Sequence, residues 1–162
     1  MAIRLCDVMG YSTPDCDSAL MHASTAGGVM MDEPKNILEF KQMSGRILGS
    51  LYAVHPRAIF IDPESFFDAD ISDDEDTLFY DTVSYPSENG YLTKTDKNSH
   101  IRLNDRSYAI LEKPDPLAPK EPIGKTLSVW AKEATSETAK AGLTQAAGAA
   151  LTLLYTLLKS GG

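Results

Sequence analysis

The chain has 162 residues, of which 43% are hydrophobic and 23% are charged, as in an ordinary soluble protein with one core of moderate size. Its 23 acidic and 15 basic residues give a net charge of -8. The basic residues are scattered and form no stripe. We therefore expect no nucleic-acid partner and little attraction to anionic lipid headgroups.

Residues 1–31 predict an irregular N-terminal arm, because small and polar residues dominate and no helical or strand period runs through them. No apolar segment of signal-peptide length begins the chain, so we expect cytoplasmic synthesis. Cys6 and Cys16 match neither a CxxC pair nor a zinc-ligand spacing. We expect reduced thiols, with a disulfide inside the arm as the alternative.

Residues 32–112 predict a β-rich core domain that begins with one helix. Asp32 as N-cap and Pro34 in the first turn predict the start of this helix, and Gly45 and Gly49 are expected to limit its length. The chain then becomes rich in β-branched and aromatic residues, which favour short antiparallel strands. Between four and six strands are predicted, and the candidate segments are residues 46–54, 57–63, 77–85, 90–94, 100–103 and 106–111.

Two residue pairs predict tight turns between strands. These pairs are Asn89-Gly90 and Asn104-Asp105, and both tolerate positive φ. Aromatic side chains of the strands are expected in the core or in cross-strand pairs. The predicted fold class is therefore α+β: a small, mainly antiparallel β domain with an irregular N-terminal arm, a Pro-rich extended strap and a long C-terminal helix.

The strap is predicted at residues 113–126. Four prolines recur between Pro114 and Pro122, and each fixes φ and lacks an N–H group. This composition favours an extended, polyproline-like segment outside any helix or sheet. We expect the strap to carry the following helix away from the β domain, even onto another subunit.

Residues 127–162 predict the C-terminal helix, which contains eighteen uncharged positions between Lys140 and Lys159. At about 1.5 Å per residue these positions span about 27 Å, close to the hydrocarbon thickness of a bilayer. The leucines nevertheless gather on one side of the helix, and Thr and Gln residues occupy the other. We expect this helix to dock on protein through Leu143, Ala147, Ala150, Leu154 and Leu157.

Three environments for this helix remain open on the sequence. It can dock on protein, anchor the chain in a membrane as a tail, or lie on a membrane surface. Docking on protein is the expectation, because a single-pass anchor has lipid on every side and needs no polar face. The protein in question is either the chain's own core or a neighbouring subunit.

The acidic run DADISDDED, residues 68–76, suggests a calcium loop but lacks the Gly and Glu that an EF-hand needs at positions 6 and 12. We interpret it as a solvent-exposed loop without a catalytic role. The sequence GKT at residues 124–126 lacks the leading glycine of a P-loop. We therefore predict no catalytic, cofactor-binding or metal-binding residues.

The histidines His22, His55 and His100 share no strand or helix face with another metal ligand at ligand spacing. A Cys6 or Cys16 nucleophile with one of these histidines as base stays open, because such groups can meet in space.

This organisation favours a non-enzymatic structural or assembly subunit of a larger oligomeric particle, associating through its arm and its C-terminal helix. The expected partners are other protein subunits, most simply further copies of the chain, and a virion is the most concrete particle. The alternatives are a small enzyme or ligand-binding module with its site in the β domain, and a tail-anchored accessory protein. No cofactor is expected for the favoured function.

Overall fold

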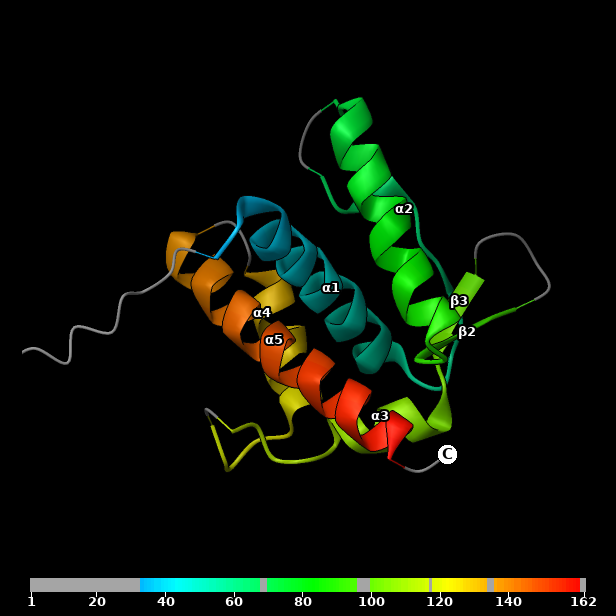
Figure 1. The fold of residues 1–162 in the computed structure, drawn as a ribbon, viewed down its shortest axis with the longest axis vertical. Coiled ribbons are helices and arrows are strands. Elements are labelled where there is room, and N and C mark those ends of the chain that lie inside the picture. The colour runs from blue at the N-terminus through cyan, green and yellow to red at the C-terminus, as the bar shows by residue number, and fades with distance from the viewer. Residues whose placement is uncertain (1–32, 68–69, 96–99, 117, 134–135, 161–162) are drawn as a thin grey trace, which may run out of the picture. The chain divides into compact units, whose positions relative to one another are not determined.

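Helices make up most of the chain in the computed structural model, which describes residues 33–67, 70–95, 100–116, 118–133 and 136–160. The predicted arm, with Cys6, Cys16 and His22, lies outside the described residues. Figure 1 shows the arrangement of the elements. In chain order they are α1 (Lys35–Val54), β1 (Ile59–Phe60), the short helical turn η3 (Pro63–Ser65), α2 (Asp73–Glu88), β2 (Leu92–Lys94), β3 (His100–Leu103), α3 (Asp105–Leu111), α4 (Ile123–Lys132) and α5 (Glu137–Lys159).

The prediction of a mainly antiparallel β domain is wrong, because the described residues form five α-helices and only one three-stranded sheet. Three predicted strands, residues 46–54, 77–85 and 106–111, belong to α1, α2 and α3. Their buried residues recur every three or four positions. In α1 the buried apolar residues are Met43, Ile47, Leu48 and Leu51, a helical spacing that β propensity had obscured.

Gly45 and Gly49 do not limit α1, because both provide space for neighbouring helices. A Cβ atom on Gly49 would lie 2.6 Å from the backbone oxygen of Leu127 in α4. On Gly45 it would lie 2.8 Å from Cδ1 of Leu143 in α5. The glycines therefore permit a close approach that alanine would obstruct. Figure 1 shows α1, α4 and α5 packed beside one another.

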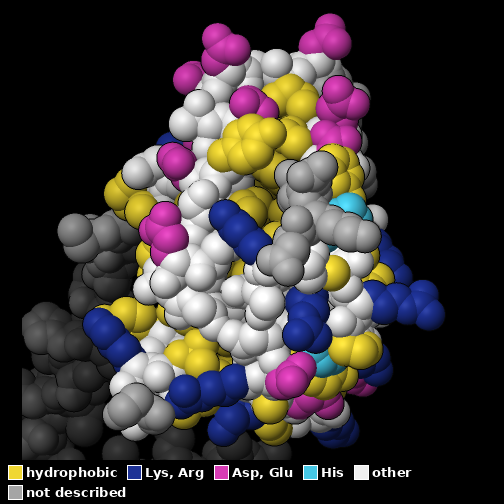
Figure 2. Space-filling model, turned by 90° about the vertical axis from the view of Figure 1, so that its right-hand side faces the viewer, with side chains coloured by type: hydrophobic (Ala, Val, Ile, Leu, Met, Phe, Trp, Pro, Cys, Tyr) yellow, Lys and Arg dark blue, Asp and Glu magenta, His cyan; other side chains and the backbone are white. Residues whose placement is uncertain are grey.

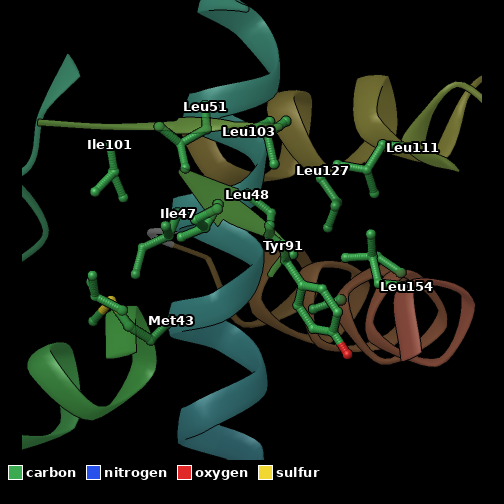
Figure 3. Close-up of a cluster of buried hydrophobic side chains, with 14 of the residues drawn as sticks. Met43, Ile47, Leu48, Leu51, Tyr91, Ile101, Leu103, Leu111, Leu127 and Leu154 are labelled. Atoms are coloured by element: carbon green, nitrogen blue, oxygen red, sulfur yellow. The ribbon is translucent and has the colours of Figure 1, made fainter. Parts of the chain in front are cut away.

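The hydrophobic core lies where these three helices meet the sheet. Figure 3 shows Leu48 and Leu51 of α1 near Leu103 of β3, with Leu127 and Leu154 from α4 and α5 completing the cluster. All five side chains are completely buried. Burial of one such side chain contributes about 1.5 to 3 kcal/mol. The cluster therefore stabilises contacts between helices that are far apart in sequence.

The expected long C-terminal helix is divided into α4 and α5. Ser136 begins α5 as its N-cap, where its side chain accepts the N–H of Ala139 at 3.1 Å. The two helices then pack together, and a Cβ atom on Gly142 would lie 2.9 Å from the Trp130 ring. The apolar residues of this region are thus used for packing between its own two halves and against α1.

The sheet has the strand order β1-β3-β2, and both pairings are antiparallel. Leu92 pairs with Leu103, and Lys94 pairs with Ile101. The predicted turn at Asn89-Gly90 instead ends α2, with Gly90 at a φ of 73°. Gly90 N–H donates to the Ser87 oxygen at 3.2 Å, and Tyr91 N–H donates to the Pro86 oxygen at 2.7 Å. These two bonds form a Schellman motif that directs the chain from α2 into β2.

The segment between Pro114 and Pro122 is not an extended strap, although it lies outside the helices and the sheet. Pro114 and Pro122 form an antiparallel bridge, so the chain returns on itself. Asp115 N–H donates to the Glu121 oxygen at 2.9 Å, and Ile123 N–H donates to the Lys113 oxygen at 3.0 Å. Prolines exclude a helix here, but they do not prevent the flanking residues from closing a loop.

The acidic run is also not simply a loop, because its last four residues form the first turn of α2. Ser72 is the N-cap, and its hydroxyl accepts the N–H of Glu75 at 3.3 Å. The Glu75 carboxylate in turn accepts the Ser72 N–H at 3.0 Å, which completes a capping box. Asp73, Asp74 and Asp76 in this turn interact favourably with the positive end of the helix dipole.

We predict that this capping box weakens in acid. The backbone N–H and the hydroxyl of Ser72 donate to the Glu75 carboxylate and lower the pKa of that group. The folded-state pKa lies below the unfolded-state pKa of about 4.3. The ionised Glu75 therefore contributes its full stabilisation at pH values above the unfolded-state pKa. This stabilisation is lost as the pH falls through the folded-state pKa. Faster amide hydrogen exchange in the first turn of α2 below that pH would report the loss.

Glu75→Gln is the matched control, because glutamine can still accept the Ser72 N–H but does not titrate. It should remove the pH dependence while the helix start stays protected. An unchanged pH dependence in Glu75→Gln would contradict the assignment to Glu75.

Candidate functional site

A cleft of about 320 Å³ lies between the sheet and α2. Its floor is apolar and comes from elements that are distant in sequence. Phe79 and Val83 of α2 meet Ile61 after β1 and Ile101 of β3, and all four are buried. The remaining lining residues are Phe60, Asp62, Pro63, Tyr80, Ser84, Lys94 and Thr95.

Two aromatic side chains stand exposed at this cleft. Phe60 of β1 is 56% exposed and Tyr80 of α2 is 55% exposed, although both line an apolar surface. Phe60 pairs with His100 across the sheet, with ring centroids 5.7 Å apart. Tyr80 packs edge-on against Phe79 at 5.6 Å. Each ring is therefore held on one side by a neighbouring ring and exposed to solvent elsewhere.

The polar groups of the cleft are few. Asp62 is the N-cap of η3, and its carboxylate accepts the Glu64 N–H at 3.0 Å. Lys94 pairs with Ile101 in the sheet, so its side chain lies on the same face of the sheet as Ile101. The Thr95 hydroxyl donates to the His100 oxygen at 3.2 Å. The cleft thus offers a mostly apolar surface with one carboxylate and one ammonium group.

A stack of three rings lies elsewhere, where α1 ends beside α3. His55 lies on Tyr108 with centroids 4.0 Å apart, and Tyr108 stacks on Tyr52 at 5.2 Å. The Tyr52 hydroxyl donates to the Glu112 carboxylate. His55 Nε2 lies 3.8 Å from Asp105 Oδ1. This cluster combines titratable groups from α1, α3 and the residues that cap them.

The pKa values of the two phenols argue against either tyrosine acting as a base. Burial and the hydrogen bond with Glu112 raise the pKa of Tyr52 far above its ordinary value. The Glu112 carboxylate likewise raises the pKa of Tyr108. Both phenols therefore stay protonated at neutral pH, and Tyr52 acts as a donor to Glu112. A Cβ atom on Gly124 would lie 2.3 Å from the Tyr52 ring, so the stack also joins α1 to α4.

The residues predicted for helix docking lie on the inner side of α5. Leu143, Ala147, Ala150 and Leu154 are buried in the chain's own core, and Leu157 is half-buried against it. Among the described helices, only α5 is long and apolar enough to cross a membrane, by length and composition alone. It has 23 residues, and 28% of its most apolar window is buried.

The other sequence candidates do not come together. His55 belongs to the ring stack, and His100 lies in β3. The GKT residues open α4 after Pro122, in a different setting from a phosphate-binding loop. No group of three or more His, Cys, Asp or Glu suited to a metal ion occurs within the described part of the chain.

Sequence reasoning missed the cleft because it placed Phe79 and Tyr80 of α2 inside a strand. The spacing of Phe79, Thr82, Val83 and Pro86 could have predicted the buried side of a helix. Tyr80 does not belong to that buried side. Comparison with known proteins gave no further guide to the site. No protein-family model, no curated protein and no solved structure matches this chain.

Proposed function

We propose that this chain is a non-enzymatic subunit of a protein assembly, and that the cleft between the sheet and α2 receives an apolar side chain of a partner protein. The observation that carries the proposal is the pair Phe60 and Tyr80, both more than half exposed beside a buried apolar floor. Aromatic residues beside such pockets are typical of the residues that dominate binding energy at protein interfaces.

The chemistry of the cleft supports binding over catalysis. Asp62 is already engaged as a helix cap, and Thr95 donates to a backbone oxygen. Among the hydrogen bonds of the described lining residues, none joins a hydroxyl to a histidine ring or a carboxylate, as an activated nucleophile would require.

The location of the cleft changes the expected route of assembly. Association through the N-terminal arm and the C-terminal helix was expected. The arm lies outside the described residues, and α5 buries its apolar side in the core of its own chain. We therefore assign docking to the cleft, with another protein subunit as partner. Formation of a homo-oligomer and incorporation into a virion or other particle stay predictions.

A small-molecule binding module is the second candidate. A volume of about 320 Å³ is at the lower end of the range for ligand pockets, and Lys94 could hold an anionic group beside the apolar floor. We favour a protein partner, because two residues that line the cleft, Phe60 and Tyr80, have largely exposed rings that a partner surface would cover.

We predict that a photo-crosslinker at the cleft reaches a protein partner. Benzoylphenylalanine in place of Tyr80 should form one reproducible protein adduct in the cells that produce the chain. The same group in place of Tyr155 is the control, because Tyr155 is similarly exposed, at 49%, on α5. Mass spectrometry of the adduct would identify the crosslinked peptide on both sides.

Phe60→Ala in the same crosslinking chain should reduce the adduct about tenfold, the loss expected when one interface anchor is removed. Because the Phe60 side chain is largely exposed, this substitution should destabilise the fold only slightly. Equal adducts from positions 80 and 155, or no effect of Phe60→Ala, would refute docking at the cleft. Adduct formation with a second copy would identify the assembly as a homo-oligomer.

A further inference from the structure

Charge is strongly segregated along the chain. Between Arg57 and Lys94 there are ten acidic residues and neither Lys nor Arg. This segment contains the whole of α2 and the residues that lead into it. The ten acids are Asp62, Glu64, Asp68, Asp70, Asp73, Asp74, Glu75, Asp76, Asp81 and Glu88. The described part of the molecule therefore carries one strongly negative helix among elements of mixed charge.

Acidic residues lie beside the exposed apolar surface. Figure 2 shows acidic side chains at the top of the view around a yellow apolar patch, with Lys and Arg side chains lower and to the right. Asp62 itself lines the cleft, and Asp81 follows Tyr80 on α2. A partner that reaches the cleft must therefore enter a negative potential.

The helical period aligns several of these groups with the cleft. Positions 73, 76, 80 and 84 are three or four residues apart, so they share one side of α2. Tyr80 and Ser84 line the cleft, and Asp73 and Asp76 extend the same side toward the helix start. Asp81 follows Tyr80 and lies on the adjacent side of the helix, about 100° away. We name Asp73 and Asp76, together with this neighbouring Asp81, the acidic stripe.

We infer that the occupant of the cleft is a cationic segment of a partner protein, in which Lys or Arg residues flank an apolar side chain. This inference rests on the proposed function. The apolar side chain fits the floor formed by Phe79, Val83 and Ile101, and the flanking cations lie along the acidic stripe. Complementary charge increases the rate of association and selects against anionic partners.

Lys94 limits where the cations can lie. Among the described residues that line the cleft it is the one Lys or Arg, and it projects from the sheet side. The partner's cations are therefore expected on the α2 side, away from Lys94. Nucleic acid and acidic peptides are disfavoured, because both would bring negative charge against the ten acids.

The test uses three capped peptides on the full chain, with the sequences Lys-Lys-Phe-Lys-Lys, Ser-Ser-Phe-Ser-Ser and Glu-Glu-Phe-Glu-Glu. Amide NMR shifts locate the binding, and titration gives the dissociation constant. The lysine peptide should bind about tenfold more tightly than the serine peptide, with shifts at Tyr80, Ser84 and Lys94. Raising the salt concentration should remove this difference, because exposed charges are then screened.

A charge-matched pair of variants assigns the effect to the stripe. Asp73→Asn, Asp76→Asn and Asp81→Asn together should weaken the lysine peptide about tenfold and leave the serine peptide unchanged. The control is Glu121→Gln, Glu133→Gln and Glu137→Gln, which removes the same charge from the α4 and α5 region. Fluorescence of Trp130, the single tryptophan, verifies that both variants are folded.

The outcomes separate this inference from the proposed function. Equal binding of the lysine and serine peptides at the cleft would overturn the cationic partner and leave docking at the cleft standing. Tightest binding of the glutamate peptide would also overturn it and would assign recognition to Lys94. Failure of the lysine peptide to bind at the cleft would overturn the inference. The crosslinking experiment at Tyr80 tests the proposed function independently.

Discussion

Replacing Gly49 by alanine should lower the free energy of unfolding by about 3 kcal/mol, the upper part of the range for overpacking a core. The new Cβ atom would lie 2.6 Å from the Leu127 oxygen and 3.0 Å from the Ser128 nitrogen, both backbone atoms of α4. Backbone cannot move aside as a flexible side chain can, so α1 and α4 would have to separate. Denaturant unfolding followed by Trp130 fluorescence measures the change.

Gly148→Ala is the matched control, with an effect of opposite sign. Its Cβ atom would meet nothing closer than Lys41 Cε at 3.6 Å, an ordinary contact. In a helix interior this substitution should stabilise the protein by about 0.5 to 1 kcal/mol. The effect of Gly45→Ala on the free energy of unfolding should lie between those of Gly49→Ala and Gly148→Ala. The atom nearest to its Cβ is the movable Leu143 Cδ1, at 2.8 Å. Equal effects at positions 49 and 148 would contradict the close packing of α1 on α4.

Replacing Ala150 by aspartate should destabilise the fold by about 3 to 5 kcal/mol at neutral pH, as expected for an uncompensated buried charge. Ala150 is fully buried within the core, on the inner side of α5. Protonation of the new carboxyl reduces this penalty, so the variant should recover part of its stability in mild acid. Thermal and denaturant unfolding at two pH values measure both effects.

Thr152→Asp is the control on the other side of α5. Thr152 is exposed, and its hydroxyl donates to the Gly148 oxygen at 2.8 Å. We expect a change within about 0.5 kcal/mol. Equal damage from both aspartates, together with a need for detergent, would support lipid around the whole helix. No damage from either would mean that α5 does not pack on the core.

The structure also shows why truncation is a poor test of assembly. Removing residues 127–162 would delete Leu127, Leu143, Ala147, Ala150 and Leu154 from the core. Loss of several such side chains exceeds the stability of a typical domain, since each costs about 2 to 5 kcal/mol when replaced by a smaller one. Substitutions at the exposed Phe60 and Tyr80 leave this core intact.

Local patterns in the sequence determined several features without tertiary information. The buried side of α5 follows from the helical spacing of Leu143, Ala147, Ala150 and Leu154. Gly90 does adopt a positive φ, as expected of an Asn-Gly pair, although it ends a helix. Segments 90–94 and 100–103 do contain strands. In each case the cause lies within a few residues of the feature.

Only the tertiary structure decided the fold class and the cleft. Gly45 and Gly49 resemble helix breakers until Leu143 and the Leu127 backbone are placed against them. The β propensity of residues 46–54 and 77–85 is outweighed by burial against α4, α5 and the sheet, because packing energies exceed the small differences in intrinsic propensity. The cleft joins Phe60, Tyr80 and Lys94 from three separate elements, and no local pattern encodes a surface that forms only when distant segments meet.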